Sequence, residues 1–333
     1  MKIVIIGSKI FDSLEYHVND SLKYLGHDVI QIDLTDVIKI PYRYSYWLQR
    51  FSRSLDNKIF KKIADKVIAH SPDLVISTYR NVNPIAIINI KRALPNTKVV
   101  QLNPDAVTTF GDQQIFASPY DAYFTKDPFI LDFMKNKMSL PTFYLPEAFN
   151  HRIHRPPLSL NRQELEDSIA TDVVAFGTMY PYRANVLKHL IKSGVKLDLY
   201  GTPSYKYHVP EIQACFKNEY ITGSRKAEVL YGSKIVFNNF HYAEVECVNV
   251  KFFEIMGIGA FQLCDYKKVI DDLCVVPAEK FTFRNIHEGV EKIHYYLNRP
   301  SERHDIAKLQ LDHFLKHHTY DIRMQEMLNI LYP

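Results

Sequence analysis

The chain has 333 residues, of which 47% are hydrophobic and 23% charged, and its formal net charge is +4. This length exceeds one small core and predicts two domains of an ordinary soluble globular protein. The small positive charge permits an anionic ligand but does not indicate nucleic acid. The apolar run from Ile3 to Ile6 is too short for a signal peptide or a membrane span, and no later run approaches membrane length. The four cysteines form no CxxC pair, so we expect reduced thiols in a cytoplasmic protein.

The first half of the chain alternates strands with helices. The strands are rich in β-branched residues, as in a buried parallel sheet, and we predict them at residues 2–10, 29–34, 73–78, 98–102, 121–125 and 142–145. Helices are predicted between them at residues 15–25, 55–69, 83–94 and 128–136. This order favours a doubly wound sheet with right-handed crossovers. The first strand leads into Gly7-Ser8 and not into the GxGxxG of a dinucleotide site.

Residues 42–53 combine aromatic and basic side chains. One interpretation is a surface that contacts a membrane interface or a polar acceptor. The other, which we favour, is a helix whose arginines cover its own aromatic face.

The alternation stops at residues 146–170, which hold three prolines and little periodicity and therefore predict a hinge. It then restarts. Strands are predicted at residues 172–176, 196–200, 234–238, 260–264 and near 275–276. Helices are predicted at residues 182–193, 226–232, 286–297, 301–317 and 320–331, with a further helix beginning at residue 248. Two Rossmann-like halves facing across a cleft are the simplest α/β architecture.

The helix expected from Val248 carries Lys251 and Glu254 one turn apart. A cation in the first turn opposes the helix dipole unless an anion binds at the helix N-terminus. Free amides and Lys251 would suit a diphosphate, and Glu254 would suit ribose hydroxyls. For this window alone we prefer the simpler interpretation, a solvated Lys251–Glu254 pair.

Two further residues suggest a phosphate site in the second half. Gly177 follows a predicted strand and permits close approach of a phosphate. Arg183, at a helix start, would add a fork of donors. Taken alone, Gly177 is equally explained as a strand end and Arg183 as a surface residue.

Short motifs follow one another in a set order along most of residues 73–333: Tyr120 to Asp127, Tyr144 to His154, Phe176-Gly177, Tyr180 to Arg183, Leu199-Tyr200-Gly201, Asn249 to Glu254 with Gly259-Ala260, and His318 to Arg323. This order resembles GT-B glycosyltransferases, most closely the spore-maturation CgeB-like family. The sequence departs from that family at Lys251, where the family has arginine. Lysine supplies charge to a diphosphate but no bidentate fork.

The resemblance implies a nucleotide-sugar donor, with a UDP-sugar favoured, bound by the C-terminal half. Glu254 would bind the ribose hydroxyls, and the remaining donor-binding residues would be Gly177, Tyr180, Arg183, Asn249 and Lys251. In this fold protein charges usually stabilise the leaving diphosphate, and the sequence has no DxD motif. We therefore expect neither a metal nor a cofactor.

The acceptor would lie against the N-terminal half, near Gly7-Ser8 and residues 103–105. An inverting reaction needs a general base, for which Asp105 is our prediction and His17 and Asp12 are alternatives. A turn-forming role for Asp105 is equally open, and a retaining reaction needs no such base. The acceptor is expected to be a glycan, a lipid-linked molecule or a protein.

The resemblance also implies the domain organisation: an acceptor domain at residues 1–150, a donor domain at 151–318, and a last helix, 319–333, that crosses back. We expect a cytoplasmic enzyme of polysaccharide biosynthesis, with peripheral contact to the inner face of the membrane if residues 42–53 bind there. Two other functions stay open. One is a non-catalytic nucleotide-sugar or glycan-binding protein with a GT-B shell, and the other is a nucleotide-sugar 2-epimerase of the same fold.

Overall fold

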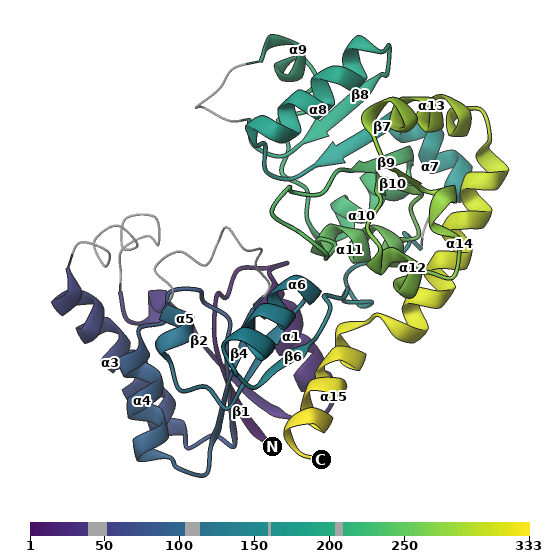
Figure 1. Cartoon of the computed structure of the whole chain (residues 1–333). Coiled ribbons are helices and arrows are strands. Elements are labelled where there is room, and N and C mark those ends of the chain that lie inside the picture. The colour runs from purple at the N-terminus through teal and green to yellow at the C-terminus, as the bar shows by residue number, and fades with distance from the viewer. Residues whose placement is uncertain (39–51, 104–113, 159–160, 204–208) are drawn as a thin grey trace. The chain divides into compact units, whose positions relative to one another are not determined.

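The computed structural model describes the whole chain except residues 39–51, 104–113, 159–160 and 204–208. The chain divides into two compact units. Unit 1 comprises Met1–Pro146 and Tyr320–Pro333, and unit 2 comprises Glu147–Thr319. Each unit is built around one parallel sheet (Figure 1).

Unit 1 contains a six-stranded sheet in the order β2-β1-β3-β4-β5-β6. Every pairing in it is parallel. The central strand consists of branched apolar residues that are fully buried, Ile3, Val4, Ile5 and Ile6, because helices cover both faces of the sheet. The strands are β1 (Lys2–Ile6), β2 (Asp28–Ile32), β3 (Leu74–Ser77), β4 (Lys98–Asn103), β5 (Ala122–Thr125) and β6 (Thr142–Tyr144).

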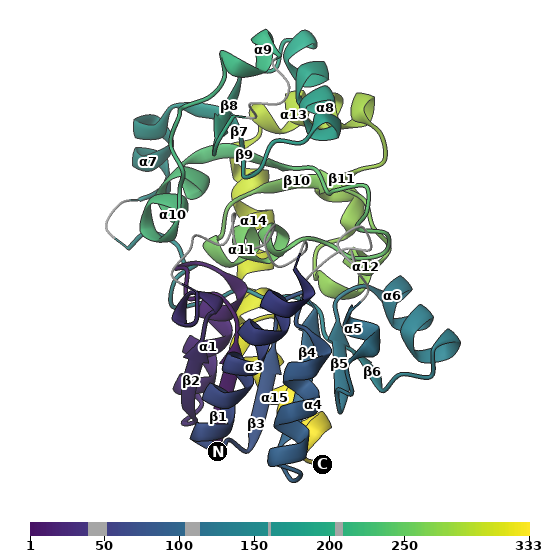
Figure 2. The same ribbon diagram turned by 90° about the vertical axis from the view of Figure 1, so that its left-hand side faces the viewer.

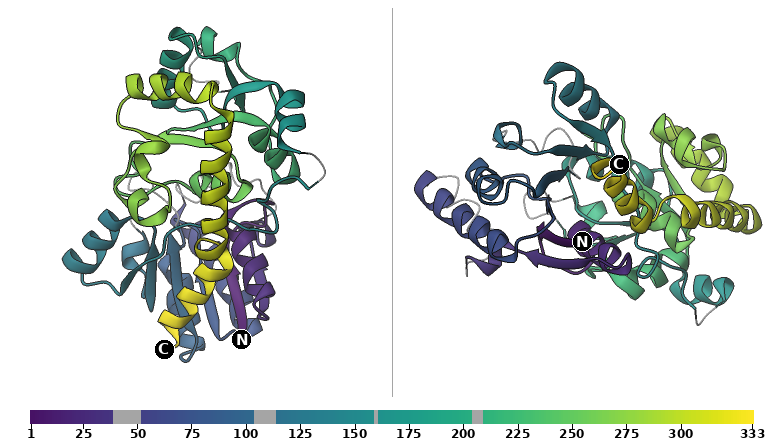
Figure 3. Two further views of the ribbon diagram at one scale, coloured as in Figure 1. Left: turned by 90° about the vertical axis from the view of Figure 1, so that its right-hand side faces the viewer. Right: turned by 90° about the horizontal axis from the view of Figure 1, so that it is seen from below.

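The helices of unit 1 lie on both faces of its sheet. α1 (Leu14–Tyr24) and α15 (Tyr320–Leu331) pack together on one face, and α3 (Arg53–His70) and α4 (Pro84–Ala93) cover the other (Figures 2 and 3). The ring of Tyr320 stacks on that of His17, with 5.5 Å between centroids, so the end of the chain completes the core of unit 1. Shorter elements are η1 (Leu34–Asp36), α5 (Gln114–Ala117), α6 (Pro128–Asp132) and the π-helical turn η3 (Phe133–Lys137).

Unit 2 contains a five-stranded parallel sheet in the order β11-β10-β9-β7-β8. Its strands are β7 (Thr171–Phe176), β8 (Leu197–Tyr200), β9 (Ser233–Asn238), β10 (Gln262–Asp265) and β11 (Thr282–Phe283). α8 (Pro181–Lys192) and α13 (Ile286–Leu297) lie on one side of the sheet, and α10 (Gly223–Tyr231) and α11 (Val250–Ile258) on the other (Figure 2). The remaining elements are α7 (Arg162–Ile169), α9 (Pro210–Gln213), α12 (Val269–Leu273), η4 (Ala278–Lys280) and α14 (Pro300–His317).

The predicted α/β class with parallel sheets is confirmed, and one local prediction is wrong. The strand expected near residues 275–276 is β11, which begins at Thr282. Pro277 follows the two valines and cannot donate to a ladder, and the Val275 amide donates instead to Gln310 Oε1 at 3.3 Å. Residues 146–170, for which we predicted a hinge, contain α7, a helix that the sequence analysis did not predict.

The sequence pattern did not predict α7 because ion pairs, more than an apolar stripe, hold this helix in place. Asn161 caps it by accepting from the Glu164 amide at 2.9 Å. Its buried Glu166 pairs with Arg303 at 3.3 Å and His304 at 2.8 Å. A search for apolar periodicity does not find a helix that is anchored in this way.

Among the described residues, no helix is both long and apolar enough to cross a membrane. Of residues 42–53, for which we weighed a membrane surface against a self-covering helix, only Ser52 and Arg53 are described. Ser52 caps α3 by accepting from the Leu55 amide at 3.3 Å. The prediction for residues 42–51 lies outside the described residues.

A glycine sets how closely α11 packs in unit 2. A Cβ atom added to Gly257 would overlap the ring of Phe149. That ring is fully buried, and the Phe149 amide donates to His318 O at 3.2 Å. The ring therefore has little room to move away.

We predict that Gly257→Ala lowers the free energy of unfolding by about 1–3 kcal/mol through overpacking. Gly289→Ala in α13 is the matched control, because its new Cβ would lie 3.3 Å from the nearest Phe283 atom and alanine is the better helix former. Urea unfolding midpoints measure both effects. Equal midpoints for the two variants would contradict the tight packing at Gly257.

Candidate anion-binding site

The strand order of unit 2 reverses between β7 and β9, because the chain passes from β7 to β8 on one side and returns to β9 on the other. Open α/β sheets bind ligands outside the carboxyl ends of the strands at such a point. Two loops border it. Residues 177–180 join β7 to α8, and residues 239–249 join β9 to α11.

Two glycines let the ends of β7 and β8 approach closely. Gly177 has φ +100° and Gly201 has φ +127°, values that residues with a side chain rarely adopt. A Cβ atom on Gly201 would lie 2.9 Å from the carbonyl oxygen of Gly177. The Gly177 amide donates to Tyr200 O at 3.0 Å. A larger residue at Gly201 would separate the two strand ends.

Two cations converge on Gly177. A Cβ atom at this glycine would lie 3.6 Å from Arg183 Nη1 and 3.7 Å from Lys251 Nζ. Arg183, at the start of α8, is 4% exposed and donates to Thr178 O at 3.2 Å. Lys251, in the first turn of α11, is half-buried and donates to Phe176 O at 3.4 Å. The structure thus brings together three residues that the sequence predicted for one site.

The carboxylates of Glu244 and Glu254 lie near enough to favour the charged form of Lys251, but neither forms an ion pair with it in the part of the chain that the structure describes. Within the described residues, neither Arg183 nor Lys251 forms an ion pair with a carboxylate, and Arg183 Nε has no hydrogen-bond partner. Burial, and then the charge of Arg183, lowers the pKa of Lys251 to about 7. Burial lowers the pKa of Arg183 to about 10, so it stays charged at neutral pH. Two buried cations of this kind favour a bound anion.

Asn249 fixes the start of α11. Its Oδ1 accepts from the Phe252 amide at 3.0 Å, as a helix cap does. Its amide also exchanges hydrogen bonds with Asn238 at 3.0 and 3.1 Å. The side chain predicted to bind the donor is therefore engaged within the protein, and it places Lys251 in the first helical turn.

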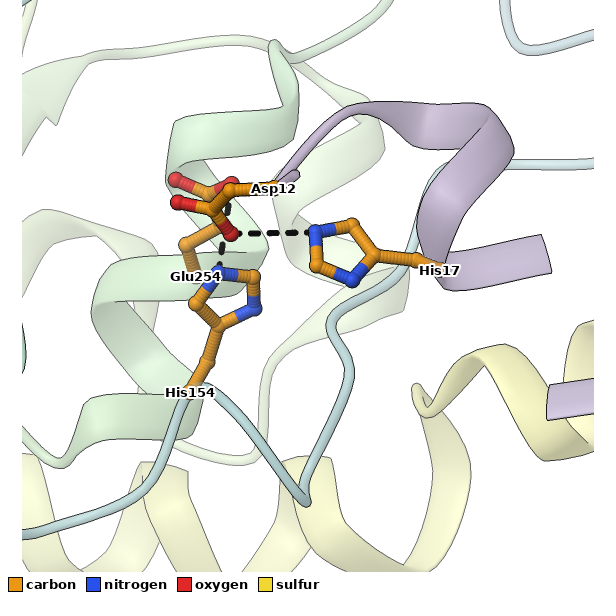
Figure 4. A group of neighbouring side chains, drawn as sticks. All are labelled: Asp12, His17, His154 and Glu254. Atoms are coloured by element: carbon orange, nitrogen blue, oxygen red, sulfur yellow. Dashed lines mark ion pairs between the residues drawn. The ribbon is translucent and has the colours of Figure 1, made fainter. Parts of the chain in front are cut away.

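Glu254 lies one turn further along α11 and is 5% exposed. Its Oε2 lies 3.1 Å from Lys226 Nζ. Its Oε1 lies 3.6 Å from His154 Nε2 (Figure 4). The prediction of a solvated Lys251–Glu254 pair is therefore wrong, because Glu254 is buried against a different lysine, Lys226. Sequence reasoning missed Lys226 and His154. The available signal for Lys226 was a lysine at helical spacing from buried Leu230 on the apolar stripe of α10.

Unit 1 has its own reversal of strand order, between β1 and β3. Gly7 follows β1 there, and a Cβ atom on it would overlap Glu15 and Thr78, so the loop through Ser8 starts tightly packed. His17 Nε2 lies 3.1 Å from Asp12 Oδ1, and both side chains are buried (Figure 4). Asp12 adopts φ +66°. Such a carboxylate–histidine contact orients the imidazole. Asp105, the predicted base, lies outside the described residues.

Comparison with solved structures defines the class of fold. A sucrose-phosphate synthase from Thermosynechococcus elongatus matches with a TM-score of 0.68 and 9% identity, over 99% of each chain. The T4 phage β-glucosyltransferase in complex with its substrate UDP-glucose matches with a TM-score of 0.59 and 13% identity, over 99% of this chain and 98% of that one. An apo structure of OtsA matches with a TM-score of 0.65 and 10% identity, over 98% of each chain. The chain has the α/β fold of GT-B glycosyltransferases over its full length.

Residues 183–329 match the family model described as "Glycosyl transferase-like". The matched segment starts at Arg183 and includes Lys251 and Glu254. A comparison with curated proteins found no match. The predicted GT-B fold is thus confirmed, and residues 183–329 are similar to a glycosyl transferase-like family. The CgeB-like family stays a prediction.

The low pKa of Lys251 predicts proton uptake when an anion binds. Above about pH 7 the free protein holds Lys251 neutral, and a bound anion favours the charged form. Affinity for UDP, our probe, should therefore fall as pH rises above 7, by at most about tenfold per pH unit. Calorimetry at pH 8 in buffers of different ionisation enthalpy measures the protons taken up.

The matched variant is Lys251→Arg, because a guanidinium stays charged throughout this range. It should remove most of the proton uptake and flatten the pH dependence, while titration of the ligand itself is the same for both proteins. If the wild type and this variant take up equal numbers of protons, Lys251 is not the titrating group.

Proposed function

We propose that this protein is a glycosyltransferase that moves a sugar from a nucleotide-sugar donor, with a UDP-sugar favoured, to an acceptor hydroxyl. The observation that carries the proposal is the convergence of Arg183 and Lys251 on Gly177 without a carboxylate partner among the described residues. A diphosphate supplies the missing negative charge. The family match of residues 183–329 supports the transferase class.

The proposed reaction breaks the bond between the anomeric carbon and the diphosphate oxygen, and the electron pair goes to the diphosphate. The acceptor oxygen forms the new bond to the anomeric carbon and loses its proton. Arg183 and Lys251 act on the leaving group, because preorganised positive charge stabilises the negative charge that develops there. We retain Asp105 as the candidate base for an inverting reaction, with the His17–Asp12 pair as the alternative among the described residues.

Glu254 is proposed to accept hydrogen bonds from the ribose hydroxyls. A carboxylate has about four lone-pair positions, so the contacts with Lys226 and His154 do not use all of them. Lys226 would fix the orientation of the carboxylate.

We predict that Glu254→Gln weakens UDP binding by about 1.5–3 kcal/mol and reduces the preference for UDP over its 2′,3′-dideoxy analogue. Glutamine keeps the size of the side chain and loses the charge that strengthens both hydrogen bonds. Thermal shift against UDP, GDP, dTDP and CMP identifies the base first, since a ligand that binds the native state raises stability. Titration of both proteins with both analogues then measures the preference, and a variant that retains the wild-type preference would exclude the ribose role.

We also propose that the reaction needs no divalent metal, because Arg183 and Lys251 already place positive charge where the diphosphate would bind. Turnover should survive exhaustive chelation with EDTA. An activity that chelation abolishes and manganese or magnesium restores would refute this proposal.

Two results would instead favour the other functions. Conversion of the donor to an epimer in the absence of any acceptor would indicate a 2-epimerase. Donor binding without turnover on any acceptor would indicate a binding protein.

A further inference from the structure

Four aromatic side chains gather beside the candidate anion-binding site. We call Tyr180, Tyr182, His241 and Tyr242 the aromatic platform. Tyr180 and Tyr182 lie at the start of α8, which follows β7. His241 and Tyr242 lie in residues 239–249, which follow β9. The ring centroids of Tyr180 and His241 are 5.1 Å apart, those of His241 and Tyr242 are 4.3 Å apart, and those of Tyr182 and Tyr242 are 6.0 Å apart. The rings therefore form one connected surface.

This surface is open to solvent. Tyr180, Tyr182 and Tyr242 are 46%, 41% and 66% exposed. Aromatic rings bury a large apolar area when they pack in a core, and exposed clusters of them mark binding surfaces. These rings contact one another without entering the hydrophobic core of unit 2.

The loop that carries His241 and Tyr242 is fixed in place. Asp265 accepts from the Phe240 amide at 2.6 Å, and Glu244 accepts from the His241 amide at 3.0 Å. His241 Nδ1 lies 3.2 Å from the Ala243 amide, which donates to it. A ligand that binds here need not order the loop, which lowers the entropic cost of binding.

The neighbouring charges select the kind of ligand. The loop and the adjacent end of β10 carry the carboxylates of Glu244, Glu246 and Asp265. They disfavour a polyanion such as nucleic acid, whose binding depends on cations placed along its phosphates. A sugar ring has an apolar C–H face, which suits the negative face of an aromatic ring.

We propose that the aromatic platform binds a saccharide acceptor of more than one sugar unit. This inference rests on the proposed function, since an acceptor hydroxyl must reach the carbon that bears the diphosphate. It places the sugar units beyond that hydroxyl on unit 2, whereas the resemblance placed the acceptor near Gly7-Ser8 and residues 103–105 of unit 1. The openness of the platform fits an acceptor chain better than the donor sugar, because pockets for small ligands enclose most of the ligand surface. The four rings, joined by three consecutive contacts, also form a surface larger than one sugar ring can cover.

The test uses the full-length protein on an array of immobilised oligosaccharides, with and without UDP, and UDP titrations in parallel. Wild-type protein should be retained on a subset of glycans. Tyr242→Ala and Tyr182→Ala should each lower retention by about tenfold, as expected for the loss of a stacked ring, with the dissociation constant for UDP unchanged. Tyr24→Ala, 65% exposed at the end of α1 in unit 1, is the matched control and should retain wild-type binding.

Three outcomes would overturn the inference. Wild-type protein that retains no glycan would exclude a saccharide platform. Retention that survives both substitutions would place the glycan site elsewhere. A weakened affinity of the two variants for UDP, with unchanged affinity for inorganic pyrophosphate, would show that the rings stack on the nucleobase instead. Failure of the wild type to bind any nucleotide would refute the proposed function and is read from the titrations alone.

Discussion

Two like charges held beside one glycine are the constraint on which the donor-side chemistry depends. Arg183 and Lys251 approach Gly177 from different helices, and burial makes their charged forms costly. They remain next to each other because the chain fixes the start of each helix, with Pro181 in the first turn of α8 and Asn249 capping α11. The unbound site therefore holds electrostatic energy that an anion would release.

α11 combines three requirements within nine residues. Lys251 faces the strand end at Gly177, Glu254 forms a buried ion pair with Lys226 on α10, and Gly257 packs against Phe149. These contacts fix the rotation and the depth of the helix at once. A shift of the helix that changed one of these contacts would disturb the other two. This explains why a mostly apolar helix carries two ionisable residues.

The fold was predictable because β-branched strands alternate with amphipathic helices, and this local pattern leaves little choice of architecture. The sequence predictions failed where an element is stabilised by an interaction that its local sequence pattern does not show. α7 is anchored by the Glu166–Arg303 ion pair, and β11 has only two residues. Within the site, Gly177, Arg183 and Lys251 were predicted together. Lys226 and His154 were missed because their partner, Glu254, is distant from both in the sequence.

The sequence by itself determined the α/β class, the order of the elements and the residue types available for an anion, since these depend on local periodicity and on motifs of neighbouring residues. Only the tertiary structure decided which charges are neutralised. Lys251 and Glu254 are one turn apart and can form a pair on an isolated helix. The fold instead gives Glu254 a buried lysine from α10 and leaves Lys251 beside Arg183. Burial and long-range partners set these electrostatics, and neither is encoded in the spacing of two residues along a helix.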